Sequence, residues 1–201
     1  MLFAYNTMSR IALISDIHAN LPALEAVMKD IEQLQCNAVY CLGDVVGYNA
    51  NPSECLEFIR SRQIPTVRGN HDEEAIGEDN PAGMNPVAYN ALMWTRQQLS
   101  EEQKQWLRLA PFQRILPNEI VLVHATQDKP NSWAYVTNVD TATHSINMLR
   151  DNQFLCFNGH THVPCTFIRH EGSIHEYESG DIQLLKTNKY LINVGSVGQP
   201  R

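Results

Sequence analysis

Polar side chains that bind metals well follow several apolar runs of strand length in this sequence. Residues 38–42 form the clearest run, which ends at Gly43 and Asp44. Four further runs end in the same way, and they deliver Asp16 and His18, Asn70 and His71, His124, and His160 and His162. One polar residue at a strand end usually marks only a turn. Five such ends indicate a metal site, because α/β folds bind ligands at the carboxyl edge of their sheets.

The candidate ligands are two carboxylates, four imidazoles and one amide: Asp16, Asp44, His18, His124, His160, His162 and Asn70. Nitrogen and oxygen donors without thiolates suit Mn²⁺, Fe²⁺, Zn²⁺, Ni²⁺ or Co²⁺. Seven donors exceed the need of one tetrahedral ion, so we expect two ions that share Asp44 as a bridge. Two ions roughly 3.5–4 Å apart would hold the attacking and departing oxygens of an in-line displacement at phosphorus.

The segments that carry these residues alternate between strand and helix patterns in the first part of the chain. A strand over residues 10–15 precedes a helix capped by Asn20, with Pro22 in its first turn. A second helix begins at Asn51 and Pro52 after the Asp44 strand, and a third strand covers residues 64–69. Consecutive β-α-β units predict a mainly parallel sheet with right-handed crossovers.

From residue 73 onward the pattern shifts first to loops and helices and then to hairpins. The expected elements are a surface excursion over 73–85, helices over 86–99 and after Ser100, a hairpin of 112–116 with 119–123 joined at Pro117 and Asn118, a helix from Asp140 to about Asn152, a hairpin of 166–170 with 173–178, and a last strand over 189–194. Two sheets with helices outside them predict a layered α/β sandwich whose loops meet at one edge.

Composition narrows the class of protein and its surroundings. A chain of 201 residues fits one domain, residues 1–201, and its net charge of −7 without a basic stripe argues against a nucleic-acid partner. Five cysteines without a C-x-x-C pair indicate reduced thiols rather than a disulfide framework. With no signal peptide at Met1–Met8 and no apolar stretch of membrane-spanning length, we expect a cytoplasmic protein without a membrane partner.

The ordered set of motifs resembles the calcineurin-like metallophosphoesterase superfamily. The motifs are Asp16-x-His18, Gly43-Asp44, Gly69-Asn70-His71-Asp72, His124 and Gly159-His160-Thr161-His162, and they span nearly the whole chain. The stretches at 15–18, 67–72 and 195–201 most resemble its small bacterial and archaeal phosphodiesterase-like branch. The resemblance implies an α/β/β/α sandwich of two mixed sheets flanked by helices, with a dinuclear metal site at the strand carboxyl ends.

The same resemblance implies a role for each site residue. One ion would be held by Asp16, His18 and His162, and the other by Asn70, His124 and His160, with Asp44 bridging and manganese as the first choice of metal. A hydroxide between the ions would attack phosphorus. His71 would protonate the leaving oxygen or brace the phosphate, steered by Asp72. Apart from the resemblance, Asn70 is a further candidate for substrate contact, and Arg68, which precedes a turn, is expected either to contact phosphate or to form a surface ion pair.

Departures from the family pattern leave an alternative open. Asp44 is followed by Val45-Val46-Gly47-Tyr48, whereas protein serine/threonine phosphatases and symmetrical diadenosine tetraphosphate hydrolases carry a downstream Asp-Arg-Gly. In addition, Ala19 and Ala125 stand where relatives commonly have glycine. The chain stops at Arg201, where relatives usually continue into further strands. Such an ending would leave a sheet edge uncovered, and a partner could cover it, so a homo-oligomer is left open.

We therefore expect a dinuclear hydrolase of a small, nucleotide-like phosphoester, whether phosphodiesterase or phosphatase. The alternative is a metal- or nucleotide-binding protein of the same fold with weak or lost hydrolysis. A barrel amidohydrolase, which also uses a His-x-His pair, is disfavoured because that fold typically needs about 250 residues.

Overall fold

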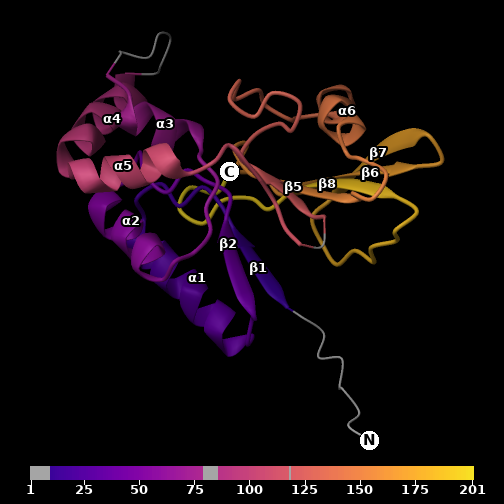
Figure 1. Cartoon of the computed structure of the whole chain (residues 1–201), viewed down its shortest axis with the longest axis horizontal. Coiled ribbons are helices and arrows are strands. Elements are labelled where there is room, and N and C mark those ends of the chain that lie inside the picture. The colour runs from indigo at the N-terminus through magenta and orange to yellow at the C-terminus, as the bar shows by residue number, and fades with distance from the viewer. Residues whose placement is uncertain (1–9, 79–85, 118) are drawn as a thin grey trace, which may run out of the picture.

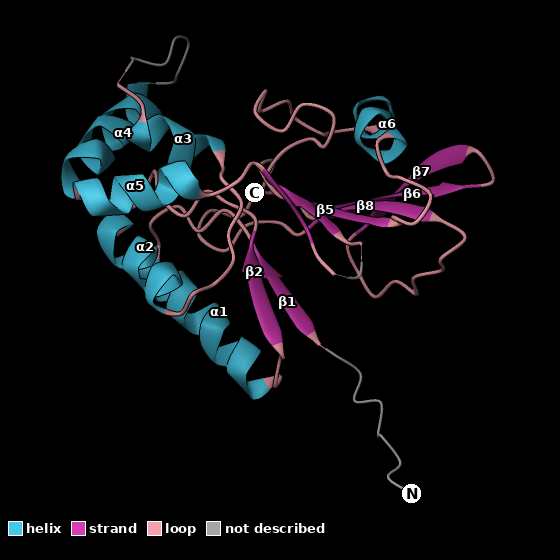
Figure 2. Ribbon diagram, in the orientation of Figure 1, coloured by secondary structure: helices cyan, strands magenta, loops and turns pink. Residues whose placement is uncertain are grey.

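The computed structural model of the chain describes residues 10–78, 86–117 and 119–201. In this part of the chain, two β-sheets lie between helices (Figure 1; Figure 2). The elements in chain order are β1 (Ile11–Ile14), α1 (Leu21–Gln33), β2 (Ala38–Cys41), α2 (Pro52–Ser61), α3 (Asn70–Ile76), α4 (Pro86–Gln98), α5 (Glu101–Leu109), β3 (Gln113–Ile115), β4 (Val121–Val123), α6 (Val139–Asn147), β5 (Leu155–Asn158), β6 (Cys165–His170), β7 (Ser173–Glu178) and β8 (Lys189–Asn193).

The smaller sheet consists of β1 and β2, which are parallel and joined through α1. The predicted cap of α1 is confirmed, because the Asn20 side chain accepts a hydrogen bond from the Ala23 amide at 3.2 Å. The predicted third strand over 64–69 is reduced to a single bridge between Cys41 and Thr66. Pro65 explains part of this, since proline has no amide proton to donate to a neighbouring strand.

The larger sheet contains six strands in the order β3-β4-β5-β8-β6-β7. Strands β4, β5 and β8 are parallel to one another, whereas β3 pairs with β4, and β6 pairs with β7 and β8, in antiparallel fashion. Both predicted hairpins and the predicted last strand are therefore confirmed. Only this sheet is mixed, because the two strands of the smaller sheet are wholly parallel.

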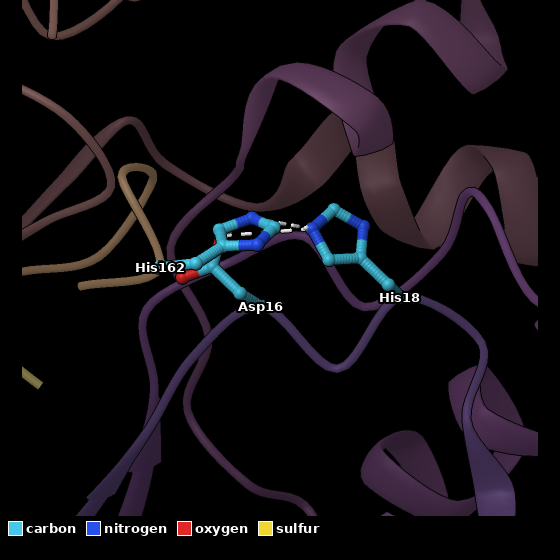
Figure 3. A group of neighbouring side chains, drawn as sticks. All are labelled: Asp16, His18 and His162. Carbon is cyan, nitrogen blue, oxygen red and sulfur yellow. Dashed lines mark hydrogen bonds and ion pairs between the residues drawn. The ribbon is translucent and has the colours of Figure 1, made fainter. Parts of the chain in front are cut away.

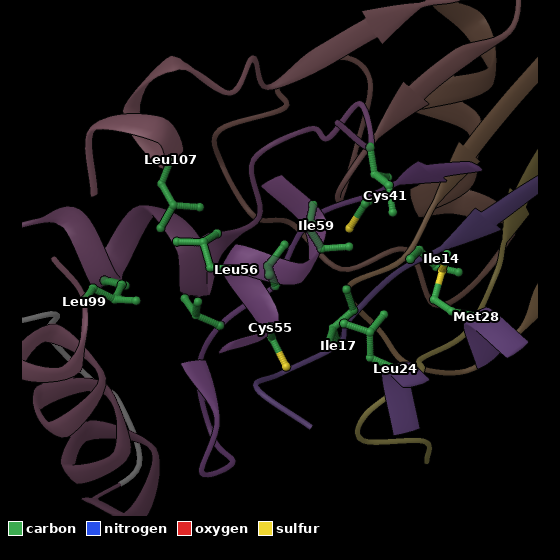
Figure 4. Packing of buried hydrophobic residues seen from close by; sticks show 14 of the residues in the cluster. Ile14, Ile17, Leu24, Met28, Cys41, Cys55, Leu56, Ile59, Leu99 and Leu107 are labelled. Atoms are coloured by element: carbon green, nitrogen blue, oxygen red, sulfur yellow. The ribbon is translucent and has the colours of Figure 1, made fainter. Parts of the chain in front are cut away.

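Three apolar clusters separate the layers and confirm the α/β/β/α arrangement. The first fills the space between the smaller sheet and helices α1, α2, α4 and α5, and Figure 4 shows its packing around residues such as Leu56 and Ile59. The second joins α6 to the outer face of the larger sheet. The third lies between the sheets, where Leu42 meets Leu122. Along β4, Val121 and Val123 belong to the second cluster and Leu122 to the third, as the period of two in a strand requires.

Helices α6, α2 and α3 differ in a boundary or a cap from the sequence-based expectations. Helix α6 is capped by Asn138, which accepts a hydrogen bond from the Thr141 amide, so Asp140 lies inside its first turn and the helix ends earlier than predicted. The Asn51 side chain makes no capping hydrogen bond to α2. Residues 73–76 continue α3 instead of forming a surface excursion, and 79–85 lie outside the described residues. No helix in the described ranges is long and apolar enough to cross a membrane.

Candidate metal centre

The strand ends of both sheets bring the candidate ligands together. Six of the seven lie in two groups whose ligand atoms are within 4.8 Å of one another, namely Asp16 with His18 and His162, and Asp44 with His124 and His160. Figure 3 shows the side chains of the first group pointing toward one another. The seventh, Asn70, begins α3 and places its Oδ1 3.2 Å from Nε2 of His124. These two groups agree with the groupings that the resemblance implies, and a third group of the same kind contains His18, Asp44 and His71.

Asp44 lies between the two groups. Its Oδ2 is 3.6 Å from Nε2 of His18 and 3.2 Å from Nε2 of His124, and its side chain is buried. Its other oxygen, Oδ1, accepts the His71 amide at 2.9 Å. One carboxylate therefore faces both groups with a single oxygen, while the backbone of α3 holds the other oxygen in place.

Backbone carbonyls determine which nitrogen of each imidazole faces the centre. Nδ1 of His18, His124 and His162 lies 3.3, 2.8 and 2.7 Å from the carbonyl oxygens of Val46, Leu42 and Gln199, and Nε2 of His160 lies 2.9 Å from that of Trp133. A carbonyl oxygen only accepts, so each of these nitrogens carries the proton. The opposite nitrogen therefore faces the centre, and in the neutral form of the ring it offers a lone pair, as metal-binding histidines do.

The inner atoms of the first group need a cation. The two Nε2 atoms of His18 and His162 are 2.9 Å apart, although in the neutral rings neither carries a proton. Asp16 Oδ1 is buried, without a hydrogen-bond donor, and lies 3.2 Å from Nε2 of His162. Acceptors packed this closely repel one another unless a positive charge lies among them. The residues present therefore fit a divalent metal ion.

Titration behaviour agrees with this requirement for positive charge. Burial lowers the pKa of His18 to about 3 and that of His160 to about 4, which keeps both rings in the neutral form that binds metals. Burial also disfavours a charged His124, but the adjacent Asp44 carboxylate outweighs it and raises the pKa of His124 to about 10. The carboxylates thus stabilise a positive charge next to Asp44.

Backbone strain is concentrated at the same residues. Five of the seven candidate ligands have positive φ angles: Asp16 (53°), His18 (47°), Asp44 (52°), His160 (68°) and His162 (65°). Each such angle costs a non-glycine residue roughly 1–3 kcal/mol and persists only where the surrounding contacts enforce it. Strain of this kind clusters at binding and catalytic sites.

Two glycines let the backbone approach the carboxylates. A Cβ on Gly159 would lie 2.1 Å from Ser15 Oγ and 2.3 Å from Asp16 Oδ2, and one on Gly69 would lie 2.1 Å from Asp44 Oδ1. The space serves hydrogen bonding, since the His160 amide donates to Asp16 Oδ2 at 3.0 Å, just as the His71 amide donates to Asp44. The glycine in each motif therefore allows the next segment to clamp a carboxylate.

The C-terminal motif holds the Asp16 loop from outside. The Ser196 hydroxyl and the Gly198 amide both donate to the Asp16 carbonyl, at 2.8 and 2.9 Å, and the Val197 amide donates to the Ser15 carbonyl. The Gln199 carbonyl of the same segment accepts the hydrogen bond from His162 Nδ1, so this segment fixes one side of the first group.

Asp72 has other partners than the sequence suggested. Its carboxylate accepts the backbone amides of Asp44, Val45, Val46 and Gly69 at 2.8–3.2 Å, and no hydrogen bond joins it to His71, whose Nδ1 is buried without a partner. The expectation that Asp72 steers the His71 ring is corrected accordingly. Asp72 joins the loop after β2 to the start of α3, and so it positions Asp44.

Arg68 is likewise occupied. Its guanidinium donates to the carbonyls of Ala110 and Arg108, pairs with Glu73 at 2.6 Å, and lies 4.7 Å from the Phe112 ring centre. The predicted substrate contact is corrected, because these partners use the donors of a side chain that is only 12% exposed. Arg68 anchors the loop before α3 to the end of α5.

Two aromatic residues beside the site were missed from sequence. The Tyr48 ring contacts the rings of His18 and His71, with centroid distances of 4.7 and 4.5 Å, and the Tyr135 ring stacks on His160 at 4.3 Å. Gly47-Tyr48 had been noted only as a departure from other families. Lone aromatic residues in loops carry no periodic signal, so only the folded chain reveals their position.

The two alanines that replace family glycines are accommodated. Ala19 is fully buried with φ of 55°, and its amide and carbonyl bond to the Val45 carbonyl and the Asn51 amide. Ala125 is buried, and its carbonyl accepts the Asn158 side chain at 2.9 Å. Neither residue displaces the ligands that precede it.

Comparisons with known proteins agree with this geometry. The family profile of the calcineurin-like phosphoesterase superfamily domain matches residues 9–201. The crystal structure of a metallophosphoesterase from Sphaerobacter thermophilus is 38% identical, with a TM-score of 0.80 over 96% of this chain and 78% of that one. The uncharacterized protein MJ0912 of Methanocaldococcus jannaschii is 37% identical over 96% of this chain and 78% of its own length.

A more distant structure shares the fold alone. Yfce, a phosphoesterase from E. coli, is 22% identical with a TM-score of 0.51, over 95% of this chain and 81% of that one. The sandwich, the convergent Asp and His side chains and the match along almost the whole sequence define a metallophosphoesterase fold. This chain belongs to the calcineurin-like phosphoesterase superfamily.

Proposed function

We propose that this protein is a hydrolase of phosphoester bonds that works with two divalent transition-metal ions bridged by Asp44. The observation that carries the proposal is that imidazole nitrogens converge on two buried carboxylates, Asp16 and Asp44. They do so in two groups, and both groups face the same Asp44 oxygen, Oδ2. In this arrangement Asp16, His18 and His162 would hold one ion, and Asn70, His124 and His160 the other. Nitrogen and oxygen donors support manganese, with iron, zinc, nickel or cobalt as alternatives.

Metal ions in such a pair polarise the phosphoryl oxygens and lower the pKa of water. The chain supplies the remaining functions. His71 differs from the other imidazoles of the site, because each of those bonds to a backbone carbonyl through one ring nitrogen, whereas the buried Nδ1 of His71 has no partner. Burial lowers the pKa of His71, so its ring is neutral near pH 7. One nitrogen of a neutral imidazole donates a hydrogen bond and the other accepts one. We assign to it the contact with a phosphoryl oxygen or the proton transfer to the departing oxygen.

The proposed substrate is a small phosphoester, and the proposed location is the cytoplasm. The net charge of −7 disfavours a polyanionic partner, since local metal ions rather than a basic surface would attract the phosphate. The cysteines of the chain are unpaired, which suits a reducing compartment.

Metal analysis combined with kinetics tests the proposal. Metal content and Mn²⁺-stimulated hydrolysis of bis(p-nitrophenyl) phosphate and p-nitrophenyl phosphate would be measured for the wild type, Asp44→Ala, His71→Ala and, as a surface control, His175→Ala. We expect Asp44→Ala to lose both metal and turnover. We expect His71→Ala to keep its metal while turnover falls about 10²–10⁴-fold, the usual contribution of a positioned acid or base. Two bound metal ions without turnover of either ester in the wild type would instead support the alternative, a metal- or nucleotide-binding protein.

A further inference from the structure

An aromatic ring with a free face lies beside the candidate metal centre. The Tyr135 ring is nearly parallel to the His160 ring, with centroids 4.3 Å apart and an interplanar angle of 23°. Tyr135 is nevertheless 53% exposed. One face of the phenol therefore covers a candidate metal ligand, while about half of the residue's surface stays accessible to solvent.

The segment that carries Tyr135 is held in place by Trp133. Trp133 has φ of 57°, a strained value for a bulky residue, and its carbonyl accepts the His160 Nε2 proton at 2.9 Å. Its ring packs against Phe112 at 5.8 Å and against His124 at 6.1 Å. These contacts hold the chain two residues before Tyr135, and the stack on His160 orients the Tyr135 ring, which lowers the entropic cost of binding.

The need to orient His160 does not by itself explain why Tyr135 lies against it. The Trp133 carbonyl already determines the tautomer and rotation of the His160 ring, and a residue needed only for packing would gain more from burial. An exposed aromatic side chain in a preorganised position is the arrangement that proteins use to stack a planar ligand group. Tyr48 lies against His18 and His71, so an aromatic ring contacts a histidine in each of the two groups of candidate ligands.

We propose that Tyr135 is a stacking platform for a nucleobase, and that the ligands of this site are nucleotides or other phosphoesters that carry such a base. The inference rests on the proposed function, because it takes the metal centre as the place where the phosphate binds. The phosphate would lie at the Asp and His cluster, and the base would lie on the open face of the Tyr135 ring.

Binding measurements test this inference without relying on turnover. The probes are the phosphonate analogues of AMP and of ribose 5-phosphate, in which a methylene group replaces the ester oxygen and prevents hydrolysis. Calorimetric titration of the Mn²⁺-loaded wild type should give a dissociation constant about 10-fold lower for the AMP analogue, in line with the effect of removing one base–aromatic stack.

Variants at one position then assign this difference to one ring. We expect Tyr135→Leu to weaken the AMP analogue about 10-fold and to leave the ribose analogue unchanged. Tyr135→Phe should retain the wild-type preference, because it keeps the stacking face. Tyr177→Leu is the matched control, since Tyr177 is 49% exposed but lies on β7, at the edge of the larger sheet.

Three results would overturn the inference: equal affinity for both analogues in the wild type, an equal loss for both in Tyr135→Leu, or binding of neither analogue. The second result would mean that Tyr135 only supports His160. A preference for the AMP analogue in a protein that hydrolyses no ester would support the stacking platform and remove only the proposed hydrolase activity.

Discussion

At the scale of single residues, hydrogen bonds outside the metal centre determine what each side chain inside it can do. Four histidines each donate a ring N–H hydrogen bond to a backbone carbonyl, so that the opposite ring nitrogen faces the centre. They are His18, His124, His160 and His162. His71 has no such commitment at Nδ1. The same residue type is therefore a candidate ligand at four positions and a candidate acid or base at the fifth.

Arg68 provides the sharpest test at this scale, because the structure and the family motif suggest different roles for it. We expect Arg68→Met to lower the free energy of unfolding by about 2 kcal/mol, since the Ala110 and Arg108 carbonyls lose a charged donor. The KM for a phosphoester should stay within about twofold of the wild-type value, because the guanidinium is engaged by backbone carbonyls and Glu73. Urea denaturation and steady-state kinetics measure the two effects.

Arg60→Met is the control for this prediction. Arg60 pairs with the exposed Glu57 and Glu102, so we expect a smaller loss of stability than for Arg68→Met, because water screens such pairs. A higher KM for Arg68→Met without any loss of stability would show that Arg68 contacts phosphate after all.

At the scale of secondary-structure elements, the strand ends act as rigid supports that are clamped to one another. The loop after β5 donates the His160 amide to Asp16 after β1, and the start of α3 donates the His71 amide to Asp44 after β2. Asp72 adds a second link between α3 and the Asp44 loop. The ligands thus keep their positions through contacts between elements rather than within them.

Gly159→Ala should break one of these clamps. Its Cβ would meet Ser15 Oγ and Asp16 Oδ2 at 2.1 and 2.3 Å, so the ends of β1 and β5 must separate. We expect the affinity for Mn²⁺ to fall at least about 10-fold, the lower end of the loss seen when the partners of metal ligands are removed. Metal titration monitored by calorimetry gives the affinity. Gly180→Ala is the matched control, because its Cβ would meet nothing within 4 Å and its φ is not positive. Equal affinities in both variants would contradict the clamp.

At the scale of the whole molecule, the metal centre joins the two sheets. Asp16, His18 and Asp44 come from the smaller sheet, whereas His124, His160 and His162 come from the larger one. In the absence of a cation, the acceptors of the first group repel one another, and this group contains Asp16 and His18 from one half and His162 from the other. Metal binding should therefore stabilise the entire fold and not only the loops.

Metal removal tests this coupling. With Mn²⁺ at about 100 times its dissociation constant, the bound ion adds about 2.7 kcal/mol, and a chain of this size gains about 2–4 °C in Tm per kcal/mol. We therefore expect chelation by EDTA to lower the Tm of the wild type by about 5–10 °C, as measured by calorimetry. Asp44→Ala should show almost no EDTA effect, because it has already lost the shared ligand. An equal shift in both proteins would mean that the ions bind elsewhere.

The sequence alone determined the strands, most of the helix starts and the identity of the candidate ligands. These features follow from local patterns: apolar runs that end in Asp, Asn or His, caps such as Asn20, and the order of the motifs along the chain. The boundaries of α6 and the missing third strand of the smaller sheet show the limit of local patterns. Asn138 and Asp140 are equally good caps by residue type, and competing contacts decide between them.

Only the tertiary structure decided which residues of the motifs reach the centre. Arg68 is bound by carbonyls about 40 residues away, Asp72 faces a loop about 27 residues away, and Tyr135 lies on a histidine from another strand end. The proton positions of the imidazoles depend on carbonyls as distant as 82 residues along the chain. Such contacts arise when the two sheets pack together, and no spacing within one segment encodes them.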